Sequence, residues 1–121
     1  MAIKRIILHN VKYIPRTDDK HVVVAVSVGD AADESSSYNV YRGLDFIARD
    51  EDADVGVKAE ITGKVTRVSV TIVDLLRESN WTSFTVFIKE GNLPVVSYGP
   101  YSEQVDEDGD TINYILKIEH Q

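Results

Sequence analysis

Apolar and polar residues alternate with a period of two along most of this chain. Four runs show the pattern clearly, at residues 22–28, 64–73, 83–89 and 112–118. Successive side chains of a β-strand point to opposite faces of the sheet, so this alternation predicts strands with one buried face. Valine and isoleucine recur in these runs, and such β-branched residues favour strands over helices.

Shorter apolar runs extend the set of predicted strands to about eight. They are Ile3–Tyr13, Tyr38–Tyr41, Val55–Ile61 and Pro94–Tyr98. The segments between them are rich in Gly, Pro, Asp, Asn and Ser, which stabilise chain reversals through their side chains or their backbone freedom. Leu44–Glu51 and Val73–Ser79 are the only candidates for helix, each for one or two turns at most.

Regularly spaced short strands without a long helix predict an all-β fold. With 121 residues, the chain has room for one hydrophobic core, so we expect a single all-β domain over residues 1–121. An antiparallel β-sandwich is the preferred architecture, and a small β-barrel is the alternative. The number of strands does not decide between the two.

The first strand segment, Met1–Tyr13, and the final strand are the expected edges of the sheets. Both alternate imperfectly, with Ile7 and Ile115 on the face that the pattern makes polar. An apolar outer face on an edge strand indicates either a covering layer or a neighbouring subunit. We favour a neighbouring subunit.

The chain is acidic overall, and the charge is unevenly distributed. It has 20 acidic and 13 basic residues, a net charge of −7 and a pI near 4.8. This balance argues against nucleic acid as a partner, since phosphates repel an acidic surface. Residues 1–28 carry five basic and two acidic residues, so their net charge of +3 leaves −10 for the rest. A basic first strand and acidic loops can complement each other between copies of the chain.

The acidic loop at residues 106–110 is the best candidate for a metal site. Asp106, Asp108 and Asp110 alternate there, and carboxylate oxygens are ligands that Ca²⁺ prefers. The loop is not an EF-hand, because Ile115 stands where that motif has its bidentate glutamate. A plain hairpin turn with Asp108 and Gly109 at its tip is the favoured alternative, since this dipeptide readily adopts positive φ. No other cofactor is expected.

Two short segments resemble known families. Glu107-Asp108-Gly109 followed by Asn113-Tyr114 resembles the carboxy-terminal calcium loop of small bacterial calcium-dependent lectins. Ile6–Val11 resembles the opening strand of the aegerolysins, which are small acidic lipid-binding β-sandwiches. Each resemblance covers about a tenth of the chain or less, and neither assigns a family. The first of them implies carbohydrate as an alternative ligand.

Residues for common enzymatic mechanisms are missing or isolated. The sequence has no cysteine, which excludes disulfides, thiolate metal sites and thiol nucleophiles. It has no Gly-x-Ser-x-Gly motif and no phosphate-binding glycine motif. His9 and His21 fall near predicted strand ends, where solvent-facing histidines are common, and His120 is expected to fray with the end of the strand. We expect no enzyme; a small hydrolase with a carboxylate pair is the least favoured function.

Aromatic and basic residues are the candidate contacts with a partner. Trp81 and Tyr101 fall at predicted strand ends or in loops, where such side chains anchor interfaces or stack on sugars. Phe87 falls on the polar face of its strand, and Lys4 and Arg5 make the first strand basic. We therefore expect a non-enzymatic module that acts through its surface, as a self-assembling structural subunit or as a protein-binding domain. A lectin-like sandwich, with or without calcium, is the alternative.

The beginning of the sequence predicts no export signal. The apolar run Ile6–Leu8 is interrupted at once by His9 and Asn10, whereas a secretory signal needs about 7–15 apolar residues. No stretch approaches the roughly 18 apolar residues of a membrane-spanning helix. We expect a cytoplasmic protein, or one that is released without a signal peptide.

Overall fold

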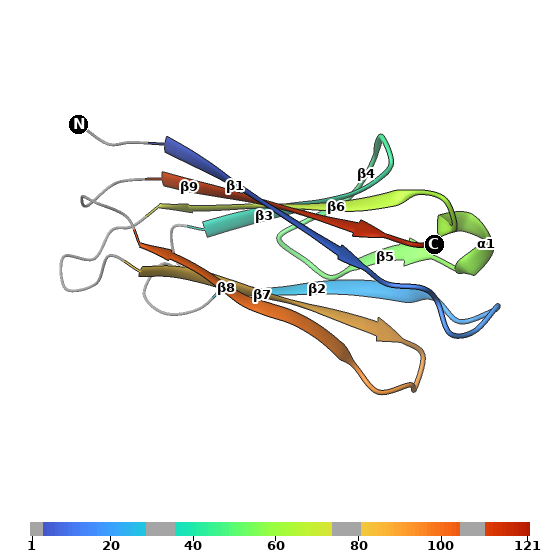
Figure 1. The fold of residues 1–121 in the computed structure, drawn as a ribbon. Helices are drawn as coiled ribbons and strands as arrows, with labels where there is room; N and C mark the ends of the chain where they lie inside the picture. The colour runs from blue at the N-terminus through green and yellow to red at the C-terminus, as the bar shows by residue number, and fades with distance from the viewer. Residues whose placement is uncertain (1–3, 29–35, 74–80, 105–110) are drawn as a thin grey trace.

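The computed structural model describes residues 4–28, 36–73, 81–104 and 111–121, and at residues 4, 5, 81, 82, 103 and 104 it describes the backbone only. These residues form two packed β-sheets that do not close into a barrel (Figure 1). The predicted all-β sandwich is confirmed, and the barrel alternative is wrong.

One sheet has five strands and the other has four. The order in the five-stranded sheet is β1 (Lys4–Lys12), β9 (Thr111–Glu119), β6 (Val65–Val73), β3 (Ser36–Arg42) and β4 (Asp45–Arg49). The order in the four-stranded sheet is β5 (Ala53–Gly56), β2 (Val22–Val28), β7 (Trp81–Glu90) and β8 (Val96–Gln104). Neighbouring strands are antiparallel throughout, except that β1 and β9 run parallel. The described residues therefore contain nine strands, one more than the sequence predicts.

The core lies between the sheets and is made by every second residue of the strands. β9 alone buries four apolar side chains, those of Ile112, Tyr114, Leu116 and Ile118. The ring of Phe84 on β7 lies 4.7 Å from the ring of Tyr114, so aromatic contact joins the two sheets at the centre. Burial of these alternating faces is the main stabilisation of the sandwich.

Leu44–Glu51, a helix candidate by sequence, contains a strand. β4 is the second strand of a hairpin that turns at Gly43, where the φ angle of 59° suits glycine. Phe46 lies opposite Tyr41 of β3, with ring centroids 5.7 Å apart. Pairing with β3 also buries Ala48, so tertiary contacts decide the conformation of a segment whose local composition is ambiguous.

The predicted strand Val55–Ile61 is divided in two. β5 covers only its beginning, and the short helix α1 (Lys58–Ile61) follows. The Glu60 side chain accepts a hydrogen bond of 3.0 Å from the backbone N–H of Val57, which gives a helical first turn one of the partners it needs. In the described ranges no helix is long and apolar enough to cross a membrane. The other helix candidate, Val73–Ser79, lies outside the described residues after Val73.

The prediction of two edge strands is correct for β1 and wrong for β9. β9 lies between β1 and β6, and pairs with both. Ile115 is therefore half-buried between its register partners Leu8 and Ser69. Ile7 packs against the core, and the outward apolar residues of β1 are Ile6 and Leu8. The side chains of β1 therefore face the opposite way from the prediction. In a strand, an assignment that is wrong by one residue moves every side chain to the other face.

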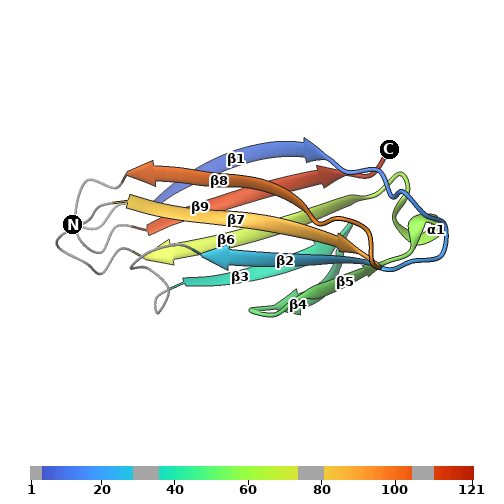
Figure 2. The same cartoon turned by 90° about the horizontal axis from the view of Figure 1, so that it is seen from below.

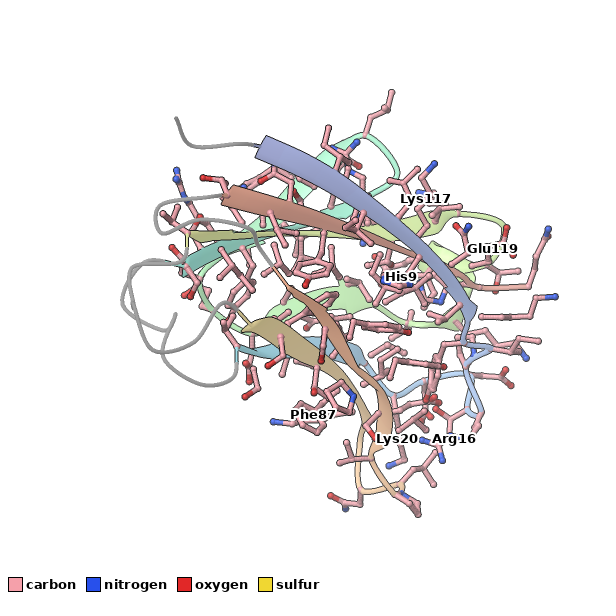
Figure 3. All side chains as sticks on the ribbon, turned by 60° about the vertical axis from the view of Figure 1, so that its left-hand side comes forward. His9, Arg16, Lys20, Phe87, Lys117 and Glu119 are labelled. Carbon is pink, nitrogen blue, oxygen red and sulfur yellow. The ribbon has the colours of Figure 1, made fainter. Side chains whose placement is uncertain are left out.

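β1 and β8, an edge strand from each sheet, lie side by side and close one flank of the sandwich (Figure 2). The imidazole of His9 stacks on Tyr101 of β8, with ring centroids 4.1 Å apart. The Tyr98 hydroxyl donates a hydrogen bond of 2.8 Å to the carbonyl of Lys12. His9 is therefore a mid-strand residue between the sheets (Figure 3), and the expectation of a solvent-facing histidine is correct only for His21.

His120 is buried, so the prediction that it frays is wrong. Its side chain is 1% exposed. Nδ1 lies 2.8 Å from the carbonyl oxygen of Tyr13, which can only accept, so Nδ1 carries the proton and donates it. Nε2 then accepts a hydrogen bond of 2.6 Å from the Thr66 hydroxyl. Burial lowers the pKa of His120, although its bond to Tyr13 acts in the opposite direction.

This burial predicts a loss of stability in mild acid. The unfolded chain takes up a proton on His120 at a pKa near 6.5, whereas the folded chain resists protonation. The free energy of unfolding therefore falls as the pH drops below 6.5, with a slope approaching about 1.4 kcal/mol per pH unit. Urea denaturation above and below this pH measures the slope. His120→Gln cannot titrate at this position and should show a smaller slope; equal slopes would contradict the assignment.

Candidate functional site

The carboxylate of Glu90, at the end of β7, is the most completely buried charge in the described residues. Its side chain is 0% exposed. It accepts hydrogen bonds from the Tyr13 hydroxyl at 2.6 Å and from the Thr17 hydroxyl and backbone N–H at 2.6 and 2.7 Å. The backbone N–H of Arg16 adds bonds of 2.9 and 3.0 Å to the two carboxylate oxygens. These donors come from the segment that links β1 to β2, on the Arg16 and Lys20 side of the molecule in Figure 3.

This arrangement makes Glu90 a structural anion rather than a reactive one. Burial alone raises the pKa of Glu90, but the hydrogen bonds from Thr17, Tyr13 and the Arg16 backbone outweigh it and lower the pKa to about 2. A general acid or base needs a pKa near the working pH and a free lone pair directed at a substrate. The Glu90 carboxylate has neither, because its oxygens are already occupied. Its role is to fix the β1–β2 connection against β7.

The outer face of the five-stranded sheet has a different character, since it exposes large apolar side chains. On β1, Ile6 is 60% exposed and Leu8 is 63% exposed. On β4, at the other edge, Phe46 is 56% exposed. Ile115 of β9 lies beside Leu8 in the register, so apolar groups continue inward from the β1 edge. We call this surface the outer sheet face.

Cationic and aromatic side chains fill the middle of the outer sheet face. The register brings Phe46, Tyr41, Arg67 and Lys117 into one row across β4, β3, β6 and β9. The Arg67 guanidinium lies over the Tyr41 ring at 4.4 Å from its centroid, which is a cation–π contact. Surfaces that combine aromatic side chains with arginine are typical of protein interfaces.

The predicted contact residues do not form one site. Tyr101 is half-buried between His9 and Phe84, so its ring helps to close the flank of the sandwich. Phe87 is half-buried on the four-stranded sheet, on the side turned away from the core. It is therefore on the opposite side of the sandwich from the outer sheet face (Figure 3). Lys4 and Arg5 lie in β1 and the backbone of Trp81 begins β7, but their side chains fall outside the described part of the chain.

The predicted calcium ligands are not tested. Asp106, Asp108 and Asp110 lie outside the described residues. Within the described ranges, no three histidine, aspartate or glutamate side chains are grouped so that they could hold a metal ion. Calcium binding stays a prediction.

Sequence reasoning missed the exposed apolar residues. The prediction that Ile7 lies on the polar face directs its neighbours Ile6 and Leu8 towards the core, and Phe46 falls within the helix candidate Leu44–Glu51. The sequence does contain a signal, because apolar residues lie on both faces of this strand. One apolar face packs on the core, and the second must either be covered by another layer or be exposed. The choice of the exposed face requires the register between β1 and β9, which the sequence does not reveal.

The chain matches no protein-family model, no curated protein and no solved structure in comparisons with known proteins.

The buried carboxylate predicts a large effect of an isosteric change. Glu90→Gln removes the negative charge and can place an amide NH₂ against the backbone N–H groups of Arg16 and Thr17, which only donate, so we expect a loss of about 2–4 kcal/mol in the free energy of unfolding at neutral pH. The wild-type advantage should vanish in acid: it is complete above pH 4.5, where the unfolded Glu90 is ionised, and is lost as the pH falls towards 2. Urea denaturation at several pH values measures both effects.

The matched control is Glu119→Gln, because Glu119 is an exposed carboxylate on β9. It should change the free energy of unfolding by no more than about 0.5 kcal/mol. Equal stabilities for the two variants at neutral pH would contradict the structural role of Glu90.

Proposed function

We propose that this protein is a non-enzymatic β-sandwich subunit that works through its surface, and that its partner is another copy of the same chain. The observation that carries the proposal is the exposure of Ile6 and Leu8, at 60% and 63%, on an edge strand whose second side pairs with no described strand. An apolar side chain at a free strand edge favours association, since both the side chain and the backbone gain a partner.

The exposed apolar side chains would contribute to association. Complete burial of a leucine or isoleucine side chain contributes about 1.5–3 kcal/mol. Ile6, Leu8 and Phe46 are each 56–63% exposed, so burial of the exposed part of each would add rather more than half of such a contribution. The rim is polar, with Lys12 and Asn10 exposed on the same strand, as in many protein interfaces.

A catalytic function has less support in the described residues. No pocket is detected among them. The buried titratable groups Glu90 and His120 have their hydrogen-bonding positions taken by the protein itself. An enzyme of this size needs a concave site with free polar groups, so a binding surface is the better proposal.

The proposal predicts that self-association depends on the two exposed residues of β1. Ile6→Thr combined with Leu8→Thr removes apolar surface and places threonine, a β-branched residue that favours strands, at both positions, so the sandwich should melt within a few degrees of the wild type. Sedimentation velocity over a wide concentration range should show larger species for the wild type. The variant should dissociate at concentrations at least tenfold higher, which corresponds to about 1.4 kcal/mol.

The control is Val95→Thr, since Val95 is 52% exposed but precedes β8 of the other sheet. It should associate as the wild type does. A wild-type protein that stays monomeric at every concentration would overturn the proposed function.

A further inference from the structure

The two edges of the five-stranded sheet carry opposite charges. One edge is β1, which contains Lys4, Arg5 and Lys12 and no acidic residue. The other edge is β4 with the turn after it, where residues 45–52 contain one basic residue, Arg49, and four acidic ones, Asp45, Asp50, Glu51 and Asp52. Asp50 accepts a hydrogen bond of 2.8 Å from the backbone N–H of Tyr38, and Asp52 lies 3.7 Å from the Lys89 ammonium. The two edges themselves cannot meet within one molecule, so their opposite net charges can attract each other between molecules.

The two edges also match in direction and in face. β9, β6, β3 and β4 alternate in direction, and β1 is parallel to β9, so β1 and β4 run in opposite directions. A β4 strand placed beside β1 of another copy, with both sheets continuing one another, therefore forms an antiparallel pair. In that arrangement Phe46 falls on the same outer face as Ile6 and Leu8, because all three side chains point away from the core.

We propose that the β4 edge of one copy pairs antiparallel with the β1 edge of the next copy, so that five-stranded sheets join into one continuous sheet. This inference rests on the proposed function and specifies its geometry. With Phe46 opposite Leu8, the antiparallel direction brings the acidic turn that contains Asp50 and Glu51 beside the end of β1 that begins with Lys4 and Arg5.

Other edge pairings fit the chain less well. Two β1 strands paired antiparallel about Leu8 would bring Lys4 of each copy beside Lys12 of the other, and like charges directly opposite destabilise a sheet. β8, an edge of the other sheet, contains Pro100, which cannot donate a backbone hydrogen bond. β5 is only four residues long. In the pairing of β1 with β4, Arg49 falls opposite Arg5, but Asp50 falls opposite Lys4, and Glu51 and Asp52 follow it. β4 also contains no proline.

Pairing of two different edges leaves a free edge on each outer copy. Such a head-to-tail contact adds further copies without limit unless the rotation between copies closes a ring. The structure therefore assigns to this chain an open assembly or a ring, and not a closed two-fold dimer. High salt should weaken the assembly, since part of the contact is electrostatic.

Disulfide trapping tests this geometry directly, because the chain has no cysteine. A disulfide requires Cα atoms about 4.4–6.8 Å apart. Leu8 and Phe46 lie on opposite edges of one five-stranded sheet, about 19 Å apart at the usual strand spacing, so they cannot bridge within one molecule. Leu8→Cys and Phe46→Cys are prepared separately and as a double variant, and each is oxidised at a concentration at which the wild type associates.

The expected pattern is specific to pairing between different edges. Each single variant alone should give little cross-linked product, an equal mixture of the two should give a cross-linked dimer, and the double variant should give a ladder of oligomers on a non-reducing gel. Val95→Cys mixed with Leu8→Cys is the matched control, since Val95 is 52% exposed, close to the 56% of Phe46, but belongs to the other sheet's side of the molecule. This mixture should not cross-link above the background of the single variants.

Three outcomes would overturn the inference. Efficient cross-linking of Leu8→Cys alone would indicate a two-fold pairing of β1 with β1. An unlinked mixture under conditions in which sedimentation shows association would overturn the β4–β1 geometry and leave the proposed function intact. A wild type that is monomeric at every concentration would overturn both.

Discussion

The buried carboxylate of Glu90 is the interaction on which the arrangement of the two sheets depends. The chain leaves the five-stranded sheet after β1 and must cross to β2 in the other sheet, and the donors that hold this crossing come from Tyr13, Arg16 and Thr17. Desolvation of a carboxylate is costly unless its oxygens are satisfied, and here they accept from two hydroxyls and two backbone N–H groups. A polar contact thus fixes a crossing that apolar packing alone would leave loosely defined.

At the same end of the sandwich, Glu90 and His120 are buried and hydrogen-bonded, although the sequence suggests that both are exposed. His120 stands next to the last position and Glu90 precedes a turn, so their local sequence suggests exposed groups. Both are buried because Tyr13, remote in sequence, reaches them: its hydroxyl donates to Glu90 and its carbonyl accepts from His120. Contacts over 77 and 107 positions of sequence leave no local pattern from which they could be read.

The all-β class could be predicted because strand alternation is a local property, and the valines of β2 or the apolar residues of β9 show it directly. Pairing order is a global property. The sequence suggests β9 as an edge, whereas parallel pairing with β1 makes it an inner strand. This one difference explains the reversed faces of β1 and the missed exposure of Ile6 and Leu8. The candidate surface could not be located until that pairing was known.

The parallel pairing of β1 with β9 also constrains how the sheet is made during synthesis. β1 leaves the ribosome well before its partner among the described strands, residues 111–119, which is translated about a hundred residues later. At typical elongation rates of about 5–20 residues per second, β1 waits for several seconds without a partner. The apolar edge strand is thus most exposed to neighbouring nascent chains before the molecule is complete, and the separation in sequence implies a high contact order and slow folding.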